Sequence, residues 1–121
     1  MTKNLEQIRA HNALTAAQNP NPNSRLRAEY VKKIPAMISQ NGLLGAMAFA
    51  LEKGDDYTNI FSAVLMHLSS NEIRLNLGNR PGAVQNFLLD LAGEPATVLR
   101  AITTETLAYL NYLRRFVSRE E

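Results

Sequence analysis

The sequence predicts an all-α protein, a single domain over residues 1–121 built as a compact bundle of about six helices. Apolar residues recur at helical spacing along most of the chain, and no segment alternates apolar and polar residues over a useful length. Gly, Pro and Asn separate these segments at short intervals, as expected for the connections of a bundle. A chain of 121 residues buries about two-thirds of its unfolded surface without disulfides or metals.

The N-terminal third contains two expected helices and one expected loop. The first helix covers about residues 4–18 and has a weak Ala/Leu stripe. Residues 19–23 form a loop, because two prolines within five residues cannot continue a helix. Ser24 is the expected N-cap of a second helix over 25–40, and Pro35 within it either starts or kinks a helix.

A helix–turn–helix corner is predicted from Pro35 to Gly42. The pair Asn41-Gly42 is a strong stop signal, since glycine readily takes the left-handed conformation that ends a helix. Leu44, Met47 and Leu51 then recur at helical spacing, so a third helix is expected over 43–53 and is ended by residues 54–56, Gly-Asp-Asp.

The C-terminal half begins with a helix over about 57–69, which is apolar on much of its circumference and should be the most buried element. A capping box favours a short helix over 71–77, followed by a loop over 78–82 and a helix over 83–92. Glu94-Pro95 should open the last helix, which runs to about residue 118. Its expected core seam consists of Leu99, Ile102, Thr106, Tyr109, Leu110, Leu113, Phe116 and Val117.

Catalytic and metal sites lack their characteristic residues. The chain has no cysteine and two histidines, without the spacing of helical zinc or di-iron carboxylate ligands, and it has no glycine-rich phosphate loop. His67 lies on an apolar helix, so it is expected to be a hydrogen-bonded core or interface residue rather than a catalytic one. Asp55-Asp56 is better explained as a turn at a helix end than as a metal pair. The sequence therefore predicts a non-enzyme without metal or cofactor.

The charge is small overall but unevenly distributed. The formal net charge is +2, and residues 1–33 are basic whereas residues 52–56 are acidic. Opposite charges at two ends would help identical copies pack head to tail, although solvated helices with mixed charge explain the pattern equally well. The longest apolar run, residues 42–51, is half of the about 20 residues that a membrane span needs, so no membrane association is expected.

The last helix presents a stripe of arginines opposite its apolar seam. At 100° per residue, Arg100, Arg115 and Arg119 fall in one band with Thr104 and Asn111, and no carboxylate lies among them. Such a stripe suits a polyanion, because each phosphate contact releases condensed counterions. Glu105 projects near the apolar boundary instead.

Further residues extend this candidate surface. Tyr112 flanks the stripe and is placed to stack on a base, while Arg25, Lys32 and Lys33 are expected on the solvent face of the second helix. The alternative is that arginines opposite a core seam are what any soluble helix shows.

Two motifs resemble a known family. A basic helix leads into Lys-Ile-Pro-Ala-Met-Ile at 33–38, Asn-Gly-Leu at 41–43 and Ala-Phe at 48–49, and the chain closes with Glu-Thr-Leu-Ala-Tyr-Leu-Asn-Tyr-Leu-Arg-Arg-Phe at 105–116. In this order, over roughly residues 25–119, they resemble the small subunit of type III-B CRISPR effector (Cmr) complexes.

The resemblance implies a non-catalytic, cytoplasmic subunit that stacks in several copies beside the backbone subunits holding the guide RNA. Its basic surface would contact target RNA, and other Cmr subunits would be its partners. The RNA-contacting residues predicted from the stripe and the resemblance together are Lys32, Lys33, Arg100, Arg114, Arg115 and Arg119. Two alternatives stay open: a helical protein–protein adaptor with no nucleic-acid role, and the small subunit of a type III-A complex.

Overall fold

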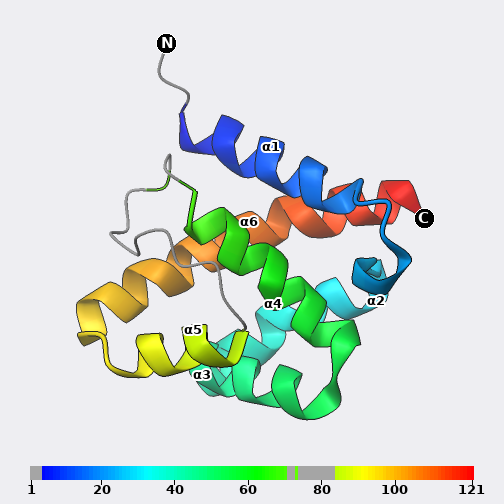
Figure 1. The fold of residues 1–121 in the computed structure, drawn as a ribbon. Coiled ribbons are helices and arrows are strands. Elements are labelled where there is room, and N and C mark those ends of the chain that lie inside the picture. The colour runs from blue at the N-terminus through cyan, green and yellow to red at the C-terminus, as the bar shows by residue number, and fades with distance from the viewer. Residues whose placement is uncertain (1–3, 71–72, 74–83) are drawn as a thin grey trace.

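The computed structural model describes residues 4–70, 73 and 84–121, and these ranges contain six α-helices, one short 3-10 helix and no strand. The α-helices are α1 Leu5–Ala17, α2 Ala28–Val31, α3 Ile34–Lys53, α4 Asp55–Leu68, α5 Val84–Ala92 and α6 Ala96–Glu120, and the 3-10 helix is η1 Pro22–Ser24 (Figure 1). The predicted all-α fold is confirmed for this part of the chain.

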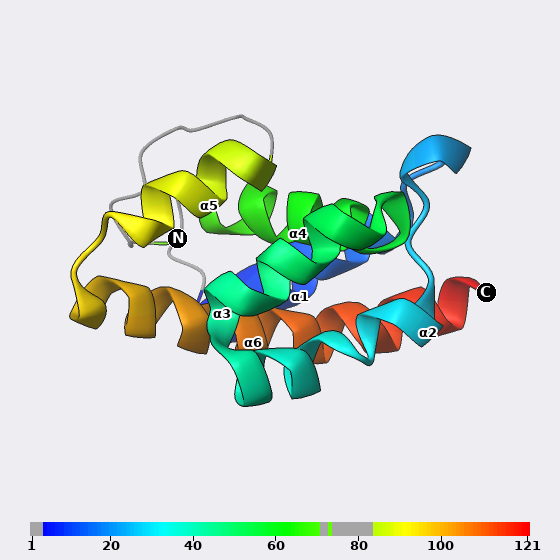
Figure 2. The same ribbon diagram turned by 90° about the horizontal axis from the view of Figure 1, so that it is seen from below.

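The long helix α6 organises the packing. α1 lies along it, and α2, α3 and α4 also contact it, whereas α5 packs on α3 and α4 (Figures 1 and 2). The predicted seam of α6 faces the core: Ile102, Thr106, Tyr109, Leu110, Leu113 and Val117 are buried, and Leu99 and Phe116 are half-buried. As expected, α4 is heavily buried, with six of its residues in the interior.

The first helix begins and ends as predicted, within one residue. Asn4 is its N-cap: its side-chain oxygen accepts a hydrogen bond from the Gln7 backbone N–H at 2.8 Å, and its own N–H donates to the Gln7 side chain at 3.0 Å. This reciprocal capping box satisfies two backbone donors that the first turn leaves unpaired.

The prediction of one helix over 25–40 was wrong. Ser24 ends η1 instead of capping a helix, α2 begins only at Ala28, and the chain turns at Lys32 and Lys33 before α3 starts. Pro35 occupies the first turn of α3, where its missing N–H costs no hydrogen bond. Proline therefore starts a new helix here.

The predicted corner is confirmed, and it bends at Gly42. That residue has φ 78° and ψ 166°, a region of backbone space that is essentially restricted to glycine. The bend divides α3 into two arms, seen in Figure 2 as a sharp change of direction. Six α3 residues on both sides of the bend are buried in the core.

Within the described residues, α3 alone is long and apolar enough, by length and composition, to cross a membrane. The bend at Gly42 separates it into the segments 34–41 and 43–53, each well short of the about 20 residues that a span requires. Ile34, Ile38, Met47 and Ala50 of α3 are buried within the protein.

A second glycine joins α3 to α4. Gly54, with φ 103° and ψ −158°, is the single residue between the two helices. Asp55 and Asp56 were expected to end the third helix, but they form the first turn of α4. There the carboxylates lie near the positive end of the helix dipole, which stabilises the start of α4.

The remaining connections were predicted in part. The short helix expected over 71–77 and the loop over 78–82 lie outside the described residues, except for Ile73, which is buried. Pro95 is the N-cap of α6 instead of a first-turn residue, and α6 continues to Glu120, two residues beyond its expected end.

Candidate nucleic-acid interface and buried polar network

The arginine surface of α6 is solvent-exposed. Arg100, Arg114, Arg115 and Arg119 all lie outside the core, and the one carboxylate in the middle of the helix, Glu105, is turned inward. None of the four arginines forms an ion pair with another described residue. Their charges are therefore available to an anionic partner.

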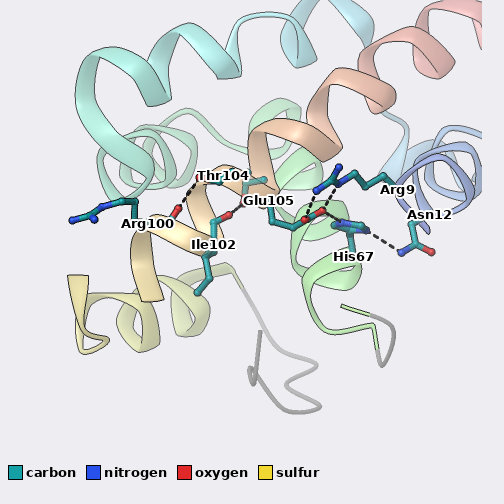
Figure 3. Close-up of polar contacts among 8 residues, drawn as sticks. Arg9, Asn12, His67, Arg100, Ile102, Thr104 and Glu105 are labelled. Carbon is teal, nitrogen blue, oxygen red and sulfur yellow. Dashed lines mark hydrogen bonds and ion pairs between the residues drawn. The ribbon is translucent and has the colours of Figure 1, made fainter. Parts of the chain in front are cut away.

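The six predicted RNA-contacting residues are spread over two regions. Arg114, Arg115 and Arg119 occupy the last turns of α6, whereas Arg100 lies about 22 Å from Arg115 along the helix axis, at 1.5 Å per residue. Figure 3 shows Arg100 pointing away from the interior of the bundle. The structure thus separates Arg100 from the other α6 arginines.

The two lysines lie toward the same end as the C-terminal arginines. α2 packs beside α6, and the Ala28 backbone N–H donates to Glu121 Oε1 at 2.6 Å, which ties the start of α2 to the end of α6 (Figure 2). Lys32 and Lys33 follow directly after α2 and are exposed. The ammonium group of Lys33 lies 5.6 Å from the centre of the Tyr30 ring.

Three further residues that the sequence assigned to the RNA-contacting surface do not extend it as expected. Arg25 lies after η1 and not on a helix with Lys32. Thr104 uses its hydroxyl proton in a 3.0 Å hydrogen bond to the Arg100 carbonyl. The Tyr112 hydroxyl donates to Glu6 of α1 at 3.3 Å, and its half-buried ring packs against the core, so it is not a free stacking platform.

The acidic corner is not opposite the α2 lysines. The Tyr30 and Tyr57 rings are 5.2 Å apart, which joins α2 to the start of α4, and the nearby Asp56 raises the pKa of Tyr30. Asp55 and Asp56 therefore lie beside α2. Of the basic segment over residues 1–33, Lys32 and Lys33 thus lie near this corner, whereas Arg9 pairs with Glu105 in the interior of the bundle.

A buried polar network joins α1, α4 and α6. Arg9 donates two hydrogen bonds to Glu105, from Nε to Oε2 and from Nη2 to Oε1, both at 2.8 Å. His67 Nε2 lies 2.9 Å from Glu105 Oε2, and His67 Nδ1 lies 2.9 Å from Asn12 Nδ2 (Figure 3). The His67 ring also stacks on Tyr109, with centroids 4.2 Å apart.

Protonation states follow from this geometry. Burial lowers the pKa of His67, although its hydrogen bond to Glu105 opposes the shift. Burial would raise the pKa of Glu105, but hydrogen bonds from Arg9 and His67 outweigh it and lower that pKa. The hydrogen bond to Glu105 raises the pKa of Arg9. A neutral His67 that donates from Nε2 and accepts from Asn12 satisfies every contact at pH 7.

The expectation that His67 is a hydrogen-bonded core histidine is confirmed, since the residue is only 1% exposed. The hydrogen-bond partners of His67 were not evident from the sequence. Glu105 lies one turn before the buried Tyr109, and a carboxylate that close to a core seam requires a cation. Arg9, on the weakly amphipathic α1, supplies it across 96 positions of sequence, a pairing that periodicity does not reveal.

The network is built for holding helices together. One carboxylate is matched by one guanidinium, and each of its oxygens accepts at least one hydrogen bond from another helix. Within the described ranges, no three His, Cys, Asp or Glu side chains lie close enough together to hold a metal ion.

The described residues form a helical domain fastened by an internal ion pair, and the arginines along its longest helix form no ion pair with any of them. These are features of a helical binding or scaffold protein. The comparison with protein families is specific: the model of the CRISPR-associated protein family Cas_Cmr5 matches residues 5–120. The chain belongs to this family, the small subunit of type III-B Cmr complexes.

The family assignment confirms the resemblance seen in the two sequence motifs, and it decides for type III-B over type III-A. It makes the chain a subunit of a type III-B CRISPR complex, in a family that is generally non-catalytic. No curated protein and no solved structure matches the chain.

Proposed function

We propose that the chain is a structural subunit of a cytoplasmic antiviral ribonucleoprotein, without catalytic residues of its own. Several copies stack beside the subunits that hold the guide RNA, and each contacts target RNA through basic residues. The proposed contacts are Arg114, Arg115 and Arg119 with Lys32 and Lys33 at one end, and Arg100 at the other.

The observation that carries the proposal is the set of exposed arginines on α6 that form no ion pair with another described residue. Internal ion pairing accounts for Arg9 and Arg27, which bond to Glu105 and Glu29, but not for the α6 arginines. Exposed cations bind phosphates regardless of sequence, as a scaffold for an RNA duplex requires. The family match over residues 5–120, to the small subunit of type III-B Cmr complexes, supports a place for the chain in a ribonucleoprotein.

The test compares assembled Cmr complexes that carry wild-type or variant chain. Arg114→Glu with Arg115→Glu and Arg119→Glu should weaken target-RNA retention, and the slope of log affinity against log salt should fall by about 0.7 for each lost phosphate contact. Arg100→Glu, tested alone, reports whether the distant arginine contributes. Lys53→Glu, at an exposed cation on α3, is the control.

Unchanged RNA retention and unchanged salt slope in the triple variant would refute the basic surface. A protein–protein adaptor without a nucleic-acid role predicts that result, because apolar docking responds little to moderate salt. Circular dichroism of each variant checks that helical content is preserved.

A further inference from the structure

A groove of about 670 Å³ lies between α1 and α4, bordered by residues around η1. One face of each helix lines it, at positions 12, 15 and 16 of α1 and 59, 62, 63 and 66 of α4. Thr15, Ala16, Ser62 and Ala63 are small, which leaves room for an incoming side chain between the helices. None of the described residues that line the groove is charged, so it offers no cation to an RNA phosphate.

Two large apolar side chains stand out from the described surface. Met66, which lines the groove, is 77% exposed, and Leu89 of α5 is 66% exposed. They are the two most exposed large apolar residues of the described part of the chain. A single exposed apolar residue is common on a protein surface, so the surroundings of Met66 and Leu89 decide whether they belong to a contact.

The face of α5 around Leu89 is uncharged. The residues three and four positions away, which are its neighbours on a helix surface, are exposed and neutral: Gln85, Asn86, Ala92 and Gly93. Asp90 is the one carboxylate within α5, and it projects about 100° away from Leu89 around the helix. Leu89 and these four neighbours therefore form an uncharged, solvent-exposed surface, the α5 ridge.

The groove and the α5 ridge match each other in size and polarity. Small side chains leave space in the groove, whereas the ridge presents a large one at its centre. Both surfaces are uncharged, so a charged partner would lose hydration on either without gaining an ion pair. In Figure 1, α4 lies between α1 and α5, so the groove and the ridge of one copy are separate surfaces.

We infer that the groove between α1 and α4 receives the α5 ridge of a second copy of the chain, with Leu89 packed beside Met66. The inference rests on the proposed stacking of copies and assigns the two surfaces that make it. Because these surfaces differ, each copy offers its ridge to one neighbour and its groove to another, and copies add in one direction. Asp55 lies about one turn before the groove residue Asn59, so the acidic corner adjoins the contact.

The first test uses introduced cysteines, which have no background because the chain contains no cysteine. Cmr complexes are assembled from an equal mixture of Leu89→Cys and Met66→Cys chains and treated with a short bismaleimide reagent. The mixture should give linked dimers in denaturing electrophoresis, whereas complexes with either variant alone should not. A mixture of Leu5→Cys and Leu51→Cys is the matched control, because both residues are exposed and apolar and lie outside the two surfaces.

The second test introduces a charge into each surface. Met66→Glu and Leu89→Glu should each lower the number of copies per complex in native mass spectrometry, because the contact would bury a carboxylate without a partner. Leu5→Glu, at another exposed leucine, should leave the number of copies unchanged. Both target residues are exposed, and thermal unfolding of each variant checks that the fold is retained.

The possible results separate this contact from the proposed function. No linked dimer from the mixture, in a complex that keeps several copies, would overturn the inference and leave stacking to other surfaces. Linked dimers from one variant alone would indicate a symmetric contact, and links to another Cmr subunit would show that the surface binds that subunit; both results would contradict the inference. A complex with a single copy of the chain would refute the proposed stacking itself.

Discussion

Replacing Glu105 by glutamine tests whether the buried network holds α1 and α4 on α6. Glu105 accepts three hydrogen bonds, two from Arg9 and one from His67. Glutamine keeps the shape but offers one acceptor oxygen, and its amide group brings a donor toward the remaining donors. The guanidinium of Arg9 would also lose its counter-charge.

The expected loss of unfolding free energy is about 2–3 kcal/mol. Removing one partner of a fully buried ion pair costs about 3–5 kcal/mol. The side chain of Arg9 is 22% exposed, so water compensates part of the loss. In a chain of 121 residues this corresponds to a fall in Tm of about 10 °C, measurable by circular dichroism or calorimetry.

A double-mutant cycle that combines Glu105→Gln with Arg9→Met isolates the interaction free energy between the two side chains from the other effects of each substitution. The coupling between positions 9 and 105 should be about 2 kcal/mol, since the residues are in direct contact. Glu120→Gln, at an exposed carboxylate of the same helix, should change stability by no more than about 0.5 kcal/mol. A Glu105→Gln effect as small as that of the control would refute the argument.

Other residues give three further predictions. Because the pKa of His67 is lowered on folding, Tm should fall as pH drops below about 6.5, where the unfolded histidine protonates, and His67→Gln should flatten this dependence between pH 7 and 5. Gly42→Ala should cost about 1–3 kcal/mol in denaturant unfolding through backbone strain, whereas Gly93→Ala should not destabilise the fold. Asp55→Lys with Asp56→Lys should reduce the copies per complex in native mass spectrometry; unchanged stoichiometry would remove this corner from the stacking contact.

Local patterns predicted most of the fold. The core seam of α6 and the stop at Gly42 follow from periodicity and from glycine's backbone freedom, and both are found in the structure. The helix expected over 25–40 was wrong because proline at a first helical turn and proline within a helix give the same sequence pattern. Packing of α2 beside α6 and α4 separates these two cases, and that contact is not local.

The candidate site was predictable in its exposed part only. Arginines opposite an apolar seam can be placed by helical geometry, and Arg100, Arg114, Arg115 and Arg119 are exposed as expected. The pairing of Arg9 with Glu105 depends on how α1 lies along α6, so it cannot be derived from a single sequence.

The internal and external faces of α6 have separate roles in this account. Glu105 bonds to α1 and α4 and thereby fixes the rotation of α6, so that the arginines stay outward. Variants of the buried network should lower thermal stability with little change in RNA binding. Variants of the α6 arginines should weaken RNA binding with little change in thermal stability. The two sets of variants can therefore be distinguished in one purified complex.

The most direct test of the central claim is photo-crosslinking of the assembled Cmr complex to target RNA that contains 4-thiouridine, followed by mass spectrometry of the crosslinked peptides. Crosslinks are expected on the C-terminal part of α6, around Arg114, Arg115 and Arg119, and they should depend on a target complementary to the guide RNA. Crosslinks confined to other subunits, with none on this chain, would contradict it.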